Sequence, residues 1–136
     1  MTMGADAAAH GSSFAVRLPA HLDSARTARQ LLDDLLDERV PRLLVQDAEL
    51  VLHELVINGV THGRPDADGL IAVACTLAEK HLEIAVRDAG EGGAITPRPW
   101  SDDQPSGRGL VMVAAICESW HVDRSHGTEV SARLRW

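Results

Sequence analysis

A glutamate and an asparagine, Glu54 and Asn58, lie four positions apart in a largely aliphatic segment. On a helix, residues with this spacing are neighbours, so the carboxylate and the amide would project from one face. A carboxylate can act as a general base, and an amide oxygen can bind a hard cation. Val51 is predicted to share this face, opposite the stripe that packs on a sheet. A solvated helix face would show the same spacing, and this alternative stays open.

Asp88 ends a run in which Leu82, Ile84 and Val86 occupy alternate positions, as on one face of a β-strand. Because Asp88 is in the same phase, its side chain is predicted to point inward. A buried carboxylate is costly unless it accepts hydrogen bonds, so Asp88 needs a donor such as an amino group or a backbone amide. An aspartate that caps a turn at a strand end is the alternative.

Glycine-rich turns follow this strand and precede a predicted helix. Gly90 and Gly92 would let the backbone approach a ligand closely. Gly107, Arg108 and Gly109 lead into the helix predicted from residue 110. The unpaired amides and the positive dipole end of a helix N-terminus suit an anion such as phosphate. An ordinary junction between loop and helix is the alternative.

Thr128 opens the final strand in phase with Val130, Ala132 and Leu134. Its hydroxyl is therefore predicted to face the same interior as Asp88. A buried threonine whose hydroxyl bonds to the backbone is the alternative.

The pattern of apolar residues predicts how these side chains are positioned. The predicted elements are a strand at 14–18, helices at 22–39 and 44–62, strands at 70–77 and 82–88, a long loop at 90–107, a helix at 110–119 and strands at 120–123 and 128–136. Because the later strands arrive as hairpins, the fold class is α+β, a two-layer α/β sandwich with a mixed, mostly antiparallel sheet and helices on one face. Residues 1–13 are predicted to be a disordered tail, and 14–136 a single domain.

Composition excludes several classes of function. Twenty acidic and thirteen basic residues give a formal charge of -7, which disfavours direct binding to nucleic acid. No apolar run approaches the ~18 residues of a membrane helix, so we expect no membrane association and a cytoplasmic location. Cys75 and Cys117 lack metal-ligand or redox spacing and are predicted to be buried free thiols.

Four motifs follow one another over about 75 residues: E-x-x-x-N, D-x-G-x-G, G-x-G before a helix, and G-T-x-V. Their order resembles the Bergerat-type ATP-binding domain of histidine kinases, type II topoisomerases and Hsp90-like chaperones, the GHKL superfamily. The nearest resemblance is to bacterial anti-sigma-factor serine/threonine kinases, and it extends over residues 14–136.

The resemblance implies a role for each motif. It implies that Asn58 binds Mg²⁺ and that Glu54 is the general base beside the phosphates of ATP. It implies that Asp88 accepts a hydrogen bond from the exocyclic amine of adenine, assisted by Thr128. The other nucleotide contacts that it implies are His62, Gly90, Gly92, Gly107, Arg108, Gly109 and Leu110.

These roles imply a serine/threonine protein kinase that uses ATP and Mg²⁺ and also serves as an anti-sigma factor. It would phosphorylate an anti-anti-sigma protein of the STAS type, hold a sigma factor inactive and form a homodimer. The alternative is a nucleotide-binding regulator that sequesters a transcription regulator without phosphotransfer. Gly59, where relatives commonly carry alanine, and the absence of a lysine just before Thr128 depart from the family pattern.

Other classes of site fit the sequence poorly. The chain has no G-x-x-x-x-G-K-[ST] motif, which disfavours a P-loop enzyme. His53 and Glu54 begin like a zinc-protease helix, but Ile57 occupies the position of the second histidine. A sensor histidine kinase would need a phosphoacceptor hairpin, whereas the residues before Glu54 are assigned to a strand and a helix.

Overall fold

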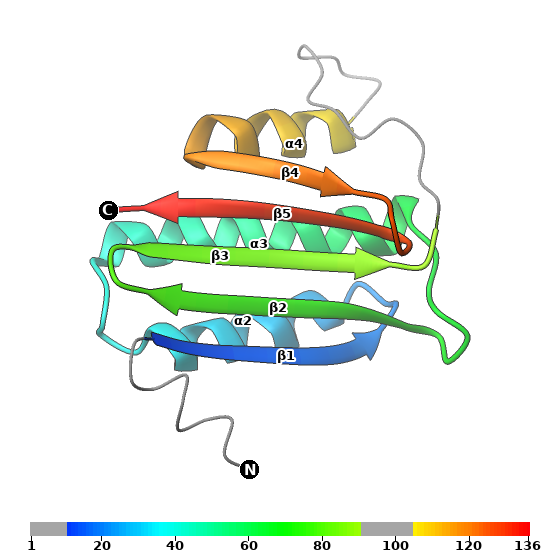
Figure 1. Cartoon of the computed structure of the whole chain (residues 1–136), viewed down its shortest axis with the longest axis horizontal. Coiled ribbons are helices and arrows are strands. Elements are labelled where there is room, and N and C mark those ends of the chain that lie inside the picture. The colour runs from blue at the N-terminus through cyan, green and yellow to red at the C-terminus, as the bar shows by residue number, and fades with distance from the viewer. Residues whose placement is uncertain (1–10, 91–104) are drawn as a thin grey trace.

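The computed structural model describes residues 11–90 and 105–136. The elements of this part are β1 (Gly11–Pro19), α2 (Ser24–Leu36), α3 (Arg42–His62), β2 (Leu70–Ala78), β3 (His81–Asp88), α4 (Pro105–Ile116), β4 (Ser119–Asp123) and β5 (Thr128–Arg135). The strands form one sheet in the order β1-β2-β3-β5-β4, with α2 and α3 behind it and α4 beside β4 (Figure 1). The predicted two-layer α+β sandwich is confirmed, and every described strand pairing is antiparallel rather than mixed.

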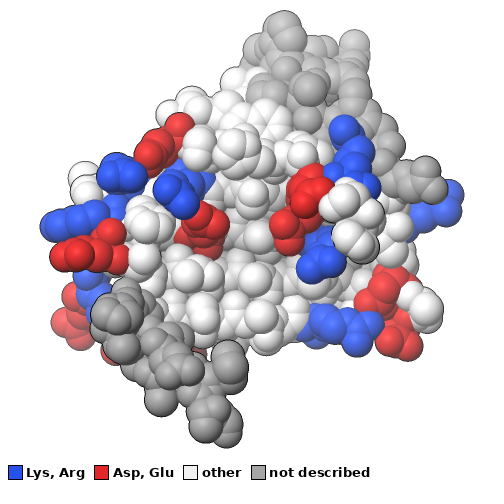
Figure 2. Space-filling view, viewed as in Figure 1, with Lys and Arg blue, Asp and Glu red and all other residues white. Residues whose placement is uncertain are grey.

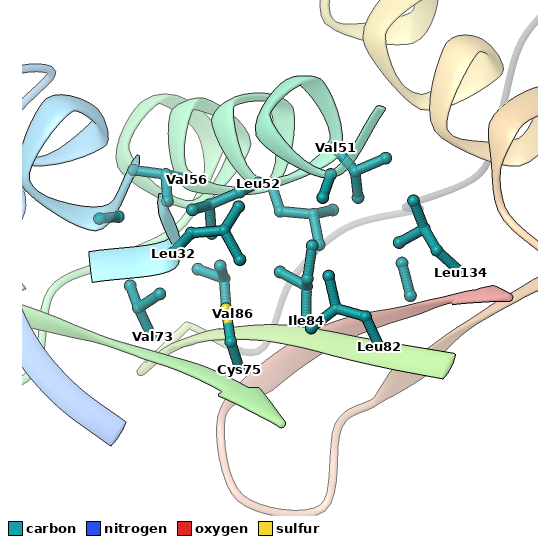
Figure 3. Close-up of a cluster of buried hydrophobic side chains, with 14 of the residues drawn as sticks. Leu32, Val51, Leu52, Val56, Val73, Cys75, Leu82, Ile84, Val86 and Leu134 are labelled. Atoms are coloured by element: carbon teal, nitrogen blue, oxygen red, sulfur yellow. The ribbon is translucent and has the colours of Figure 1, made fainter. Parts of the chain in front are cut away.

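The core lies between the sheet and the helices α2 and α3 (Figure 3). Alternate residues of β2 and β3 face it, as the period of two along a strand requires. The largest fully buried side chains are aliphatic: Leu32, Leu36, Leu52, Leu55, Ile71, Leu82, Ile84, Leu134, Val51, Val56, Val73 and Val113. Burying each such side chain contributes about 1.5–3 kcal/mol, so this layer fixes which face of α3 turns away from the sheet.

No element within residues 11–90 and 105–136 covers the other face of the sheet (Figure 1). Figure 2 shows this face with an uncharged centre between two groups of charged side chains. Arg133 pairs with Glu83 at one end of the sheet, while Arg17 pairs with Asp66 and Asp68 at the other. These ion pairs bring charges of opposite sign together at both ends of this face.

The longest helix, α3, has boundaries that the sequence explains. It begins directly after Pro41 and ends before Gly63, whose amide still donates to the Gly59 carbonyl at 3.0 Å. Pro65 then disfavours helical backbone at the residue before it. No helix of the described part is long and apolar enough to cross a membrane.

Three element boundaries differ from prediction by three residues, and one of them is the end of α4, at Ile116 rather than at residue 119. The strand β1 begins at Gly11 rather than at residue 14, because residues 11–13 pair with residues 76–78 of β2. The helix α2 ends at Leu36 rather than at residue 39, because Asp37 and Glu38 adopt positive φ angles of 24° and 63°. Residues 11–13 therefore belong to the fold and not to the predicted tail, of which residues 1–10 lie outside the described part.

The helix α4 begins at Pro105, earlier than the predicted start at residue 110. Proline suits a first helical position because its φ is already near the helical value and no intrahelical amide bond is lost there. Gly107, Arg108 and Gly109 therefore lie inside the helix rather than ahead of it.

Candidate functional site

Glu54 and Asn58 project from α3 at the border of the buried stripe. Both residues are half-buried, and neither side chain forms a hydrogen bond or ion pair with residues 11–90 or 105–136. Val51, predicted to share their face, is instead fully buried, because α4 packs against α3 and adds Val113 to the core. The carboxylate and the amide are therefore partly enclosed, and no described residue occupies their hydrogen-bonding positions.

Main-chain amides hold the Asp88 carboxylate in place. Its Oδ1 accepts hydrogen bonds from the Gly90 amide at 2.7 Å and the Arg64 amide at 3.2 Å. The Ala89 amide donates to the Arg64 carbonyl at 2.8 Å, which ties the end of β3 to the segment after α3. Among the described residues Oδ2 forms no hydrogen bond, so this oxygen can accept one from a ligand.

Three glycines allow the chain to close around Asp88. A Cβ on Gly63 would lie 2.3 Å from Asp88 Oδ2, and a Cβ on Gly127 would lie 2.3 Å from the Asp88 carbonyl oxygen. A Cβ on Gly90 would lie 3.0 Å from Asp88 Oδ1. We call Gly63, Arg64, Asp88, Gly90 and Gly127 the Asp88 cradle.

Asp88 and Gly90 are the two members of the cradle that the sequence predicts as site residues, whereas the other three carry no predicted role. The G-T-x-V pattern contains Gly127, and its φ of +77° is the left-handed conformation that favours glycine. Gly63 directly follows the helix predicted at 44–62, where a glycine also fits an ordinary helix end. Arg64 acts through its backbone, for which the residue type gives no signal.

Thr128 lies opposite Asp88 in the β3–β5 pairing and is only 1% exposed. Its hydroxyl donates to the Gly90 carbonyl at 2.7 Å. The inward orientation is confirmed, and the hydroxyl bonds to the backbone, as the alternative interpretation had it. Its lone pairs remain able to accept a hydrogen bond, so assistance to a base by way of water stays a prediction.

The start of α4 changes the predicted anion site. In a helix from Pro105, the amides of Gly109 and Leu110 are directed at carbonyls one turn earlier. The amides without intrahelical partners are instead those of the first turn, which includes Gly107 and Arg108. The predicted contact at Gly92 lies outside the described residues.

Helix α3 sets the distance between the Asp88 cradle and the pair formed by Glu54 and Asn58. The cradle adjoins its C-terminal end at Gly63, and the rise per residue puts Asn58 roughly 8 Å and Glu54 roughly 14 Å farther along the axis. The His62 side chain is exposed at the same end and forms no hydrogen bond or ion pair with a described residue. A ligand lying along α3 could therefore meet an acceptor at one end and a carboxylate and an amide toward the other.

The described residues contain no group of three or more histidine, cysteine or acidic side chains that could hold a metal ion. A cation at Asn58 would take its remaining ligands from phosphate and water. Mg²⁺ is commonly bound in this way, through few protein oxygens together with phosphates, so the residues present fit it.

The two cysteines are free thiols, as predicted. Burial raises the pKa of Cys75 to about 12. Burial, with a smaller contribution from Asp47, raises the pKa of Cys117 to about 11, although this residue is only half-buried. Both thiols are protonated near neutral pH and are poor nucleophiles.

Comparisons with known proteins connect this geometry to a family. Residues 18–136 match the family described as histidine kinase-like ATPase domain. An anti-sigma F factor from Clostridium novyi (strain NT) is 30% identical over 98 residues, which cover 63% of this chain and 67% of that protein.

A solved structure has the same fold. The RsbU and RsbW domains of Rv1364c from Mycobacterium tuberculosis superpose with a TM-score of 0.68 at 24% identity. The match covers 90% of this chain but only 32% of that one, and at this identity it establishes the fold alone.

Proposed function

The chain belongs to the histidine kinase-like ATPase family, and from that premise we propose that it is an ATP-dependent serine/threonine kinase and anti-sigma factor. The observation that carries the proposal is the Asp88 carboxylate, which is fixed by two main-chain amides and keeps one oxygen able to accept a hydrogen bond. Such a group suits the exocyclic amine of adenine and disfavours guanine, which has a carbonyl oxygen at that position.

The residues proposed to act on the phosphates of ATP lie on α3. Asn58 would hold Mg²⁺, which neutralises charge on the phosphates when it is bound. Glu54 takes the proton of an attacking serine or threonine hydroxyl, and the hydroxyl oxygen forms a bond to the γ-phosphorus. The bond from that phosphorus to the β–γ bridging oxygen breaks, and ADP leaves. The half-buried position of Glu54, without a partner among the described residues, supports this role.

The proposed partners follow from the name of the Clostridium novyi relative, an anti-sigma F factor. We extend that role to this chain: it sequesters a sigma factor, phosphorylates an anti-anti-sigma protein of the STAS type and acts as a homodimer. The net charge of -7 is compatible with regulation through a protein partner rather than through DNA.

Phosphotransfer can be tested with γ-labelled ATP, Mg²⁺ and STAS-type proteins from the same organism. Label should appear on a partner serine or threonine, and Glu54→Gln should reduce transfer about 10²- to 10⁴-fold while nucleotide binding persists. Asp47→Asn is the matched control, because it removes an exposed carboxylate from the same helix.

Two results separate the alternatives. If Glu54→Gln transfers phosphate as fast as the wild type, Glu54 is not the general base. Nucleotide-dependent binding of a transcription regulator, without label on any partner, would support the alternative of a regulator that does not transfer phosphate.

A further inference from the structure

The segment 63–70 runs from the end of α3 to the first residue of β2, and its first two residues, Gly63 and Arg64, belong to the Asp88 cradle. The Arg64 amide donates to Asp88 Oδ1 at 3.2 Å, and the Arg64 carbonyl accepts from the Ala89 amide at 2.8 Å. A displacement of this segment would therefore move one of the two donors that orient the carboxylate.

The same segment is anchored to β1 at its other end. The Arg17 guanidinium donates to Asp66 and also to Asp68 Oδ2, the latter at 2.9 Å. Asp66 Oδ1 accepts from the amides of Asp68 at 2.8 Å and Leu70 at 3.0 Å, so this carboxylate also shapes the turn. The hydrogen bond from Arg17, together with these amides, holds the pKa of Asp66 below its usual value.

A cavity borders this corner on the open face of the sheet. Its volume is about 420 Å³, and it is lined by Arg17, Asp66, Asp88, Ala89 and Gly127, among others. On this side the position of the segment depends on hydrogen bonds, which are those of Arg17 together with main-chain bonds such as that from the Ala20 amide to the Gly69 carbonyl at 3.0 Å.

We propose that Arg17 is a positioning residue for nucleotide selectivity: it holds segment 63–70 so that the Arg64 amide fixes Asp88 for the base. Arg17 lies on the open face of the sheet and acts on the acceptor through Asp66, Asp68 and the segment that carries the Arg64 amide. The inference rests on the proposed function, because it assumes that Asp88 reads adenine.

The test compares Arg17→Ala and Arg17→Lys with the wild type in calorimetric titrations with ADP and GDP. Arg17→Ala should weaken ADP binding about 2- to 10-fold, the range expected when exposed ion pairs are lost, and should narrow the preference for ADP over GDP. Arg17→Lys can still pair with one carboxylate and should restore part of the loss. The rate of phosphotransfer at saturating ATP should stay unchanged.

Arg133→Ala is the matched control. Arg133 also forms an ion pair on the open face, with Glu83, and its side chain is 37% exposed against 52% for Arg17. It is not bonded to segment 63–70. This variant should keep the affinity and the selectivity of the wild type.

Amide hydrogen exchange without nucleotide gives an independent readout. Exchange at Arg64 and Gly90 should be faster in Arg17→Ala than in Arg133→Ala. Equal exchange rates and equal ADP affinities in the two variants would overturn the role of Arg17. If the wild type binds no nucleotide, the proposed function fails, whereas the exchange experiment still shows whether Arg17 orders the cradle.

Discussion

At the scale of single residues, the chemistry of the candidate site depends on how Asp88 is held. Its Oδ1 accepts from the Gly90 and Arg64 amides, and the close approach of Gly63 leaves no room for a side chain beside Oδ2. A carboxylate fixed in this way needs little reorganisation to accept a hydrogen bond, which favours both affinity and discrimination.

Asp88→Asn should weaken ADP binding about 10- to 100-fold, the loss expected for a hydrogen bond to a charged group. The asparagine oxygen can still accept from the two amides, but its NH₂ group would then face the amine of adenine, and two donors would meet. GDP binding should change less. Competition titrations with ADP and GDP measure both effects.

Asp123→Asn is the control for that substitution, because Asp123 also accepts from a main-chain amide, that of Ser125, but lies at the end of β4 and is exposed. It should leave nucleotide binding unaltered. A preference for ADP over GDP that survives Asp88→Asn would show that another group reads the base.

At the scale of elements, the close contact between the end of α3 and the end of β3 builds the site. Gly59 is buried in α3, where a Cβ would lie 3.3 Å from Val86. Gly63 continues this close approach at the cradle. The departure from the family pattern at Gly59 thus has a packing explanation in addition to any effect on helix stability.

Gly63→Ala should destabilise the fold by about 1–3 kcal/mol or more, because the new methyl group would lie 2.3 Å from Asp88 Oδ2 and 2.5 Å from the Gly59 carbonyl oxygen. It should also abolish measurable nucleotide binding, since relief of the clash must move either the carboxylate or the helix end. Urea unfolding and ADP titration report the two effects.

Gly69→Ala separates this clash from backbone strain. Gly69 has a φ of +80°, but a Cβ there would meet no atom within 4 Å. Only the left-handed backbone penalty of about 1–2 kcal/mol applies, and ADP binding should persist. Normal ADP binding by Gly63→Ala would contradict the geometry of the cradle.

The order of the elements and most of their boundaries could be predicted because each rests on local periodicity and local turn signals. The burial of Val51 could not, since it depends on α4, more than fifty residues away along the chain. Likewise, the bonds from Arg17 to Asp66 and from Arg64 to Asp88 join segments far apart in the sequence. Predicting such pairs requires the strand order, which a single sequence does not supply.

At the scale of the whole molecule, one helical layer covers one face of the sheet, and the candidate site lies at the edge of that layer. Cys75 lies on β2 and faces the core between the sheet and this layer, with no exposed surface. Its buried thiol therefore reports on opening of the core.

Alkylation of Cys75 near pH 8 should be slow, because burial raises the pKa of its thiol to about 12 and excludes the reagent. A nucleotide that binds only the folded state should slow the reaction further, about 100-fold at a concentration 100 times the Kd. Mass spectrometry resolves Cys75 from the half-buried Cys117. A labelling rate that ATP leaves unchanged would contradict binding to the folded domain.

Calorimetric titration of the wild-type chain with ADP in the presence of Mg²⁺ tests the central claim most directly. We expect a saturable isotherm with one site per chain and much weaker binding of GDP under the same conditions. The absence of heat and of any shift in the thermal unfolding midpoint at millimolar ADP and ATP would contradict the assignment of Asp88, Asn58 and Glu54 to a nucleotide site.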